Sequence, residues 1–190
     1  MNTPGHAIVN LLVLGKRDSQ SLFAPVAVGA VLPDFPMFVF YAYEKSWLKT
    51  PERVIWSEAY YDPVWQAFFD VFNSLPLLAL GVLVARLLAR PHAAVLFLSM
   101  MLHAVCDLAL HREDAHRHFF PFSDWRFQSP VSYWDPRHYG SIVSTIEMVV
   151  VVVGAVVLFR QYPGRGPRIF LGLILACYTF YIGYALVVWA

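Results

Sequence analysis

Long runs of apolar residues, separated by shorter polar or basic connections, dominate the chain. A transmembrane helix needs about 20 consecutive, mostly apolar residues. Five stretches come close to this length or exceed it: Leu22–Tyr43, Ala67–Ala89, Ala93–Leu110, Ser141–Phe159 and Ile169–Ala190. The pattern therefore predicts an all-α, polytopic helical membrane protein with about five spans.

A shorter apolar piece, Gly5–Gly15, precedes these stretches. Thr3-Pro4 before it is a helix-start signal, because proline is favoured in the first turn. The piece has 11 residues, too few to cross a membrane at a rise of about 1.5 Å per residue. We expect a half-membrane helix packed on the next one. We also expect the helix of Ala93–Leu110 to continue past the membrane until Phe119-Phe120-Pro121 stops it.

The composition supports a membrane protein. Hydrophobic residues make up 58% of the chain and charged residues 14%, against a usual charged fraction of about 25%. A soluble domain of this length could not bury so much apolar surface, and disordered, collagen-like and disulfide-scaffold classes do not fit. The net charge of +1 indicates no nucleic-acid partner. We therefore expect a single integral membrane domain over residues 1–190.

Basic residues gather in three short connections, which the positive-inside rule assigns to the cytoplasm. These residues are Lys16, Arg17, Arg86, Arg90, Arg160, Arg165 and Arg168. The longer loops, Glu44–Gln66 and the histidine- and aromatic-rich His111–Gly140, then lie outside. This predicts a protein of the bacterial cytoplasmic (inner) membrane with its site facing the outer side. The sequence leaves the oligomeric state open.

Ionisable side chains inside membrane spans are costly, and each one marks a candidate functional site. Counted at about 1.5 Å per residue from the basic ends, those of this chain fall at one depth in the outer half of the bilayer. This layer contains His6, Asp34, Asp70, Asn73, His103, Asp107 and Glu147. One shared polar site explains the common depth. Hydrogen bonding within the bundle is the alternative for His103, Asp70 and Glu147.

The layer includes a run of metal-ligand residue types. His103 and Asp107 are four residues apart and share a helix face, and a continuing helix keeps His111, Asp114 and His118 near that face. Nitrogen and oxygen donors without thiolate suit zinc first, and also manganese or iron. A run about 22 Å long exceeds one coordination sphere, so we expect one or two divalent ions. A wet segment at the headgroup level is the alternative for His116 and His118.

Residues 119–140 read FFPFSDWRFQSPVSYWDPRHYG, with eight aromatics in 22 residues. Aromatic residues anchor proteins at the membrane interface. The same segment is also a candidate lid that holds an amphiphilic substrate between rings, with Trp125 against it and Arg126 or Arg137 on a phosphate. Both interpretations stay open.

Taken together, these motifs resemble the membrane-bound metal-dependent hydrolases of the YdjM-like family. The matching pieces are Thr3-Pro4-Gly5-His6, Gly29-Ala30-Val31-Leu32-Pro33-Asp34, Leu102-His103-Ala104-Val105-Cys106-Asp107 and the stretch from Pro121 to Trp125-Arg126-Phe127. The resemblance implies a helical membrane hydrolase whose metal ligands are His6, Asp34, His103 and Asp107.

Two departures from the family pattern concern further ligands. Phe35-Pro36 stands where the family usually has a second acid. Phe72-Asn73-Ser74-Leu75 stands where it usually has His-Arg-Gly-x-Thr-His-Ser. The residues that could replace the missing ligands are His111, Asp114, His116 and His118.

We expect a metal-dependent hydrolase that cleaves a phosphoester or other ester of a lipid or amphiphile. A metal-activated water, with its pKa lowered to about 7, would attack, and Asp114 or Glu147 would accept a proton. The alternatives are a non-catalytic metal-binding or ion-transport protein, and an accessory subunit that docks a partner through the aromatic loop. The apolar inner halves of Ala93–Leu110 and Ser141–Phe159 argue against an ion path.

Overall fold

In the computed structural model, the described part of the chain is helical and contains no strand. The structure describes the backbone of residues 1–15 and 19–189, and the side chains of the same residues except 181, 182 and 184–189. The α-helices are α1 (Thr3–Leu14), α2 (Phe23–Val31), α3 (Phe35–Ala42), α4 (Glu52–Ser57), α5 (Pro63–Asn73), α6 (Leu75–Leu87), α7 (Pro91–Leu110), α8 (Gly140–Gln161) and α9 (Arg165–Trp189). Short 3-10 or π turns are η1 (Gln20–Leu22), η2 (Leu32–Asp34), η3 (Tyr43–Leu48), η4 (Ala59–Tyr61) and η5 (Pro136–His138). The expected all-α class is confirmed.

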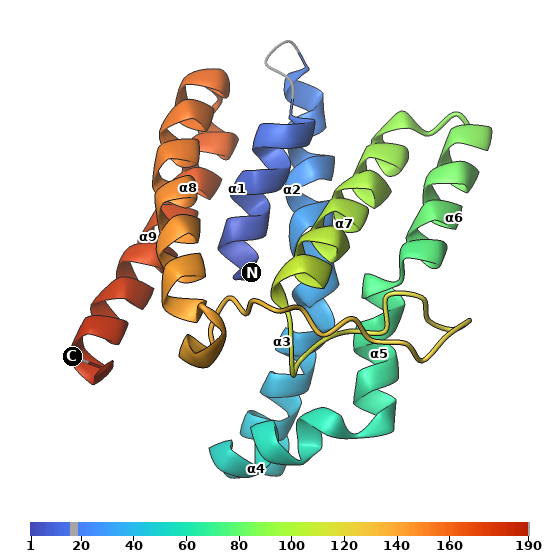
Figure 1. Cartoon of the computed structure of the whole chain (residues 1–190). Helices are drawn as coiled ribbons and strands as arrows, with labels where there is room; N and C mark the ends of the chain where they lie inside the picture. Colours follow the sequence, from blue (N-terminus) through green and yellow to red (C-terminus); the bar gives the residue numbers. More distant parts are fainter. Residues whose placement is uncertain (16–18, 190) are drawn as a thin grey trace.

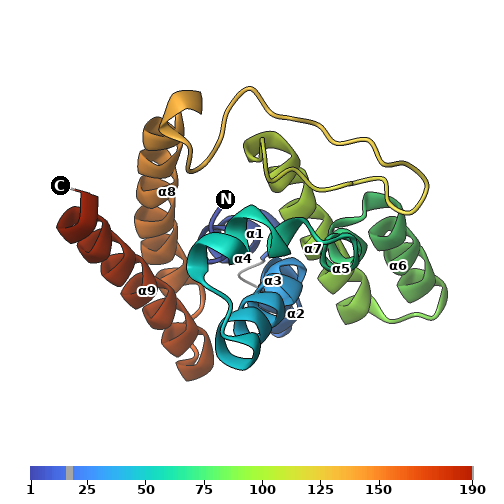
Figure 2. The same cartoon turned by 90° about the horizontal axis from the view of Figure 1, so that it is seen from below.

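Helix α1 lies at the centre of the bundle (Figures 1 and 2). It packs on α2, α7 and α8, while α7 also packs along α6, and α8 along α9. Ala7, Ile8 and Leu11 of α1 are fully buried in the main hydrophobic core. The expected short apolar helix packed on its neighbours is therefore confirmed. It brings His6, near its N-terminal end, into the interior.

Three helical segments are long and apolar enough to cross a membrane: Gln20–Leu48, Pro91–Leu110 and Gly140–Gln161. The pair α5 and α6, bent by 43°, makes a fourth if it is one broken span. The total of five spans stays a prediction. Ala190, the end of the fifth expected span, lies outside the described residues, as do Lys16 and Arg17.

The expected span Ala67–Ala89 is interrupted at Ser74. Its Oγ accepts a hydrogen bond from the Leu77 amide at 3.3 Å, and Pro76 lies in the first turn of α6. Serine is a preferred helix N-cap, and a proline inside one continuous helix would remove a backbone hydrogen bond. The segment after α7 fills the break, since the Leu75 amide donates to the His118 carbonyl at 2.9 Å.

Helix α7 ends at Leu110, so the expected extension to Phe119 is wrong. His111 has extended dihedral angles, φ −103° and ψ 137°. The carboxylates of Glu113 and Asp114 are unfavourable near a helix C-terminus, and Asp114 Oδ1 accepts from the Arg112 amide at 3.2 Å, a local bond that competes with helix formation. The chain therefore folds back, and residues 111–118 do not extend the helix face of His103.

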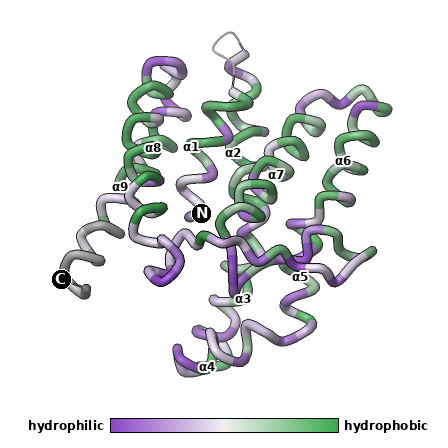
Figure 3. Tube along the Cα trace, viewed as in Figure 1, coloured by the Kyte–Doolittle hydropathy of each residue, from purple (hydrophilic) through white to green (hydrophobic). Residues whose placement is uncertain are grey.

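The connections α6–α7 and α8–α9 lie at one end of the bundle, and α4 and the segment 111–139 lie at the other (Figure 1). Hydrophobic residues cover α6, α7 and α8 between these ends, whereas hydrophilic residues gather around α4 and that segment (Figure 3). The basic residues of the described connections thus share one end: Arg86, Arg90, Arg160, Arg165 and Arg168. The structure agrees with the predicted sorting of loops, and which end faces the cytoplasm stays a prediction.

Candidate metal centre

Three histidine side chains converge on the carboxylate of Asp107. His6 Nε2 of α1 lies 2.9 Å from Asp107 Oδ1, and His103 Nε2 of α7 lies 2.9 Å from Oδ2. His111 Nε2, just after α7, lies 3.1 Å from Oδ1. His6, His103 and Asp107 are almost completely buried. One carboxylate therefore sits among three imidazole nitrogens in the protein interior.

Asp34 approaches the same cluster from η2. Its Oδ1 lies 3.4 Å from His103 Nε2, and its Oδ2 accepts a hydrogen bond from Thr3 Oγ1 at 2.5 Å. Thr3 is the first residue of α1, so this bond ties the start of α1 to the junction between α2 and α3. The structure thus brings together four of the seven residues predicted at one depth, namely His6, Asp34, His103 and Asp107.

The protonation of His103 follows from its partners. Its Nδ1 donates to the carbonyl oxygen of Ala30 at 2.7 Å, so the neutral ring carries its lone pair on Nε2. Although Nε2 is close to two carboxylates, it has no partner in a hydrogen-bonding direction. The ring stacks on His6 with centroids 3.5 Å apart and planes at 13°. Two imidazolium charges at that separation would repel each other, which favours at least one neutral ring.

These donors fit a divalent metal ion. The ligand atoms of His6, His103 and Asp107 all lie within 4.8 Å of one another. Ligands bonded at about 2.0–2.1 Å in a tetrahedron are about 3.3 Å apart, close to the separations of 2.9 and 3.4 Å around His103 Nε2. The His103–Ala30 bond is the kind of outer hydrogen bond that orients a ligating histidine. The buried cluster could therefore bind a metal ion.

His111 and Asp114 lie beside this cluster. His111 Nδ1 is 3.0 Å from Asp114 Oδ2, while the amino group of Met1 lies 3.1 Å from Asp107 Oδ1 and 3.2 Å from His111 Nε2. Burial lowers the pKa of His111, but the charge of Asp107 and hydrogen bonds to Asp107 and Asp114 together raise it to about 9. His111 therefore lies between the carboxylates of Asp107 and Asp114.

Two further members of the predicted layer, Asp70 and Asn73, have partners outside the cluster. Asp70 is fully buried and accepts from Arg117, with Nε to Oδ2 at 2.5 Å and the backbone amide to Oδ1 at 2.9 Å. His116 Nδ1 lies 3.7 Å from Asp70 Oδ1, and Asn73 Nδ2 donates to the Phe69 carbonyl at 3.1 Å. Equal depth did not place these side chains in the His–Asp cluster.

His118 and Glu147 also have partners outside the cluster. His118 places Nδ1 3.0 Å from the His116 carbonyl and Nε2 2.8 Å from the Ala104 carbonyl, so both nitrogens face acceptors. Glu147 Oε1 accepts from the Asn2 amide at 3.0 Å, from the Asn2 side chain at 3.1 Å and from the Tyr178 hydroxyl. Glu147 thereby fastens the start of α1 to α8.

The predicted substrate-binding residues lie away from the cluster. Arg126 donates to the Ala115 carbonyl at 2.5 Å and to Gln66 Oε1 at 3.0 Å. Arg137 pairs with Asp135, and Trp125 is half exposed. The group Glu113, Asp135 and His138 also has metal-ligand spacing. However, Asp135 already accepts from Arg137, which lowers its pKa, so its oxygens are engaged.

A pocket of about 470 Å³ adjoins the cluster. Asp34, His111 and Asp114 belong to its wall, and aromatic rings form much of the remainder. The sequence interpretation did not single out these ring residues: Phe38, Trp56, Tyr60, Tyr61, Tyr133 and Trp134. The aromatic-rich segment 119–140 could have indicated Tyr133 and Trp134. The other four residues come from α3, α4 and η4, where the sequence carries no comparable signal.

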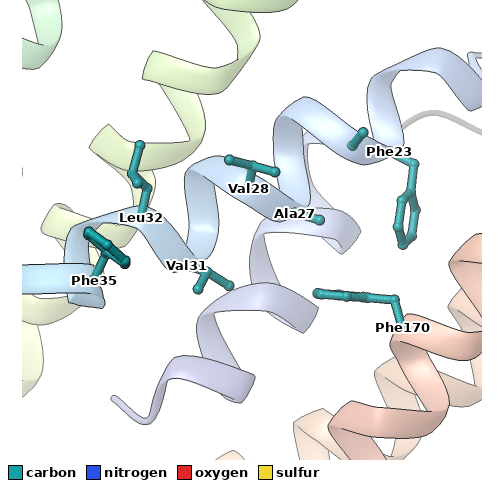
Figure 4. A pocket seen from close by; sticks show the side chains of 8 residues that line it. Phe23, Ala27, Val28, Val31, Leu32, Phe35 and Phe170 are labelled. Carbon is teal, nitrogen blue, oxygen red and sulfur yellow. The ribbon is translucent and has the colours of Figure 1, made fainter. Parts of the chain in front are cut away.

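A second, apolar pocket of about 400 Å³ lies along α2, where Phe170 of α9 faces Phe23 (Figure 4). Its wall includes Leu32 and Phe35, the neighbours on either side of Pro33-Asp34. The polar pocket and the apolar pocket therefore meet the same short stretch of chain.

Comparisons of the chain with family models, with curated proteins and with solved structures find no match. The resemblance to the YdjM-like family accordingly stays a prediction.

Proposed function

We propose that this protein is a membrane-embedded, metal-dependent hydrolase that cleaves an ester, foremost a phosphoester, of a lipid or amphiphile. The observation that carries the proposal is the convergence of His6, His103 and His111 on Asp107 beside a large aromatic pocket. Buried clusters of imidazole nitrogens and carboxylate oxygens, with a histidine oriented by an outer hydrogen bond, are typical of metal centres.

His6, His103, Asp107 and Asp34 would hold the first ion, and Asp107 with His111 would hold a second. Zinc suits these donors, and manganese or iron would also fit them. A bound divalent ion would supply an activated water and polarise the ester oxygen. Asp107 contacts both groups of histidines, so it is the natural bridging carboxylate.

The protein's own residues orient the site and handle the proton. Ala30 fixes the His103 ring, Thr3 holds Asp34, and Asp114 holds His111 through Nδ1. Burial opposes ionisation of Asp114, yet its hydrogen bond with His111 and the charges of His111 and His116 keep its pKa low. As an ionised carboxylate on the pocket wall, Asp114 is the candidate proton acceptor.

An amphiphilic substrate would make use of both pockets, which meet the same short stretch of chain, Leu32–Phe35. The polar pocket with Asp34 can hold a head group, and the apolar pocket with Leu32 and Phe35 can hold part of a hydrocarbon chain. Such pockets usually have a few polar groups in a mostly apolar wall. With the basic connections in the cytoplasm, the site would open toward the outer side of an inner membrane.

The packing next to the cluster favours hydrolysis over ion transport. One turn beyond His6 and His103, Asn10 Nδ2 donates to the Ser99 carbonyl at 2.7 Å and to Ser99 Oγ at 2.8 Å. Beyond this pair the described core is apolar, with Leu11, Leu158 and Tyr162 packed together. Transport sites are expected to continue as a polar path.

The test is hydrolysis by purified, zinc-loaded protein in detergent. Bis(p-nitrophenyl) phosphate serves as a chromogenic probe, and phospholipid in mixed micelles as the amphiphile. We expect turnover by the wild type and by His92→Ala, an exposed histidine at the start of the same helix, but background rates for His103→Ala. Equal activity of both variants would overturn the proposal. Metal binding without turnover would instead favour the non-catalytic metal protein.

A further inference from the structure

The pocket beside the metal cluster has an unusual charge pattern. Its ionisable wall groups are the carboxylates of Asp34 and Asp114, the imidazoles of His111 and His116, tyrosine hydroxyls, and the amino group of Met1, which is paired with Asp107 at 3.1 Å. Neither lysine nor arginine is among its described wall residues. A pocket built to bind a free anionic group would normally present a guanidinium or ammonium that is not already paired with a carboxylate.

The arginines of the neighbouring segment are held elsewhere. Arg112 donates to the Ser129 carbonyl at 3.0 Å, Arg117 pairs with Asp70 and Asp124, and Arg126 donates to Ala115 and Gln66. These bonds satisfy the guanidinium groups at the outer end of α7. The cationic groups at the pocket wall, Met1 and His111, are likewise paired, with the carboxylates of Asp107 and Asp114.

The rest of the wall is aromatic. Trp56, Tyr61 and Trp134 are each about half exposed and so have ring surface available to a ligand. Tyr60 and Tyr133 are more deeply placed, and burial, together with the charge of Asp114, raises the pKa of both hydroxyls. These neutral rings near carboxylates resemble the surroundings in which proteins bind quaternary ammonium groups, through the negative faces of aromatic rings.

We propose that the aromatic pocket binds the quaternary ammonium end of a zwitterionic lipid head group of the choline type. The proposal rests on the proposed hydrolase function, because the metal cluster at the pocket wall would take the phosphate of the same head group. The aromatic rings and the two acids would then take the cation, and the apolar pocket along α2 would take part of a chain. The pocket volume of about 470 Å³ lies within the usual range for small-molecule sites.

The test measures binding rather than hydrolysis. Radiolabelled choline is bound to the purified, chelator-treated full chain, and then displaced by tetramethylammonium or by 3,3-dimethylbutan-1-ol, the uncharged isostere of choline. We expect tetramethylammonium to displace the label about tenfold more effectively, a difference of about 1.4 kcal/mol, since only the cation can interact with the negative faces of the rings. Equal displacement, or no saturable choline binding, would overturn the proposal.

A pair of variants tests the aromatic wall. Tyr61→Leu removes a half-exposed ring and should weaken choline binding about threefold to fivefold, while Tyr61→Phe keeps the ring and should bind choline as the wild type does. The same loss in both variants would contradict a cation–π contact. Thermal unfolding of both proteins, measured alongside, identifies a fold defect.

Competition between a lipid and its free head group tests whether the quaternary ammonium ligand belongs to a lipid. A short-chain phosphatidylcholine should displace labelled choline at a concentration at least about tenfold lower than free phosphocholine, because its chains add buried apolar surface. Equal potency would overturn the lipid part of the proposal. The outcomes also separate the two proposals. Choline binding without phosphodiester hydrolysis would contradict the proposed hydrolase function. Hydrolysis without a preference for the cation would contradict only the proposed recognition of a choline-type head group.

Discussion

The Nδ1 of His103 donates a hydrogen bond to the backbone carbonyl oxygen of Ala30 at 2.7 Å. Ala30 belongs to the last turn of α2, where carbonyl groups lack partners within the helix. The bond turns Nε2 of His103 toward Asp107, 2.9 Å away, and fixes the tautomer that can bind a metal. The packing of α2 on α7 therefore sets the geometry of the candidate metal centre.

Gly29→Ala should disturb this geometry. A Cβ at Gly29 would clash with the Leu96 carbonyl oxygen and would meet Ser99 Cβ at 2.7 Å, so α2 and α7 would have to separate. We expect a loss of about 1–3 kcal/mol in unfolding free energy and roughly tenfold weaker zinc binding, measured by thermal unfolding and by chelator competition.

Gly172→Ala is the matched control for this prediction, because an added Cβ there would meet nothing within 4 Å. It should leave zinc affinity and stability close to those of the wild type. Unchanged zinc affinity in Gly29→Ala would show that the α2–α7 spacing does not position His103.

Asp107→Asn should remove bound metal altogether. Asp107 is the side chain that contacts His6, His103 and His111, and the neutral amide is a poor ligand for zinc. Elemental analysis of protein purified in detergent measures the ions per chain, with His92→Ala as the control. Full metal content in Asp107→Asn would contradict the proposed bridging role.

Helix geometry explains which parts of the site could be predicted. Rise and turn per residue are nearly constant, so the sequence indicated both the depth of His6, Asp34, His103 and Asp107 and the shared face of the last two. Their convergence in the structure follows from α1, η2 and α7 lying side by side. The apolar runs likewise predicted the helices, because burial in a membrane requires continuous apolar residues.

The segment after α7 shows where this reasoning failed. The Leu75–His118 backbone bond and the Asp70–Arg117 pair join residues more than 40 positions apart, and periodicity carries no information about such contacts. Depth alone grouped Asp70 with the His–Asp cluster, although Arg117 is its partner. Arg126 was expected on substrate, yet its donors are used by Ala115 and Gln66.

Arg117→Ala should destabilise the fold without affecting the metal centre. It would leave the fully buried carboxylate of Asp70 without its main donor, at a cost of about 2–3 kcal/mol. Thermal unfolding in detergent measures the change, and zinc content should stay at the wild-type value. Arg53→Ala, which removes an exposed arginine of α4, should leave the melting temperature unchanged. Equal stability of the two variants would contradict a structural role for the Asp70–Arg117 pair.

His111 and His118 should respond differently to substitution, although both were expected to be ligands. His111 Nε2 faces Asp107 at 3.1 Å, so His111→Ala should reduce the metal content to one ion per chain. Both nitrogens of His118 face the carbonyl groups of His116 and Ala104, so His118→Ala should keep the full metal content and lower the unfolding free energy by about 1–2 kcal/mol. Elemental analysis and thermal unfolding of the two variants, side by side, measure both effects. Loss of metal in His118→Ala would mean that the segment rearranges on metal binding and that the continuous donor run is the better description of the site.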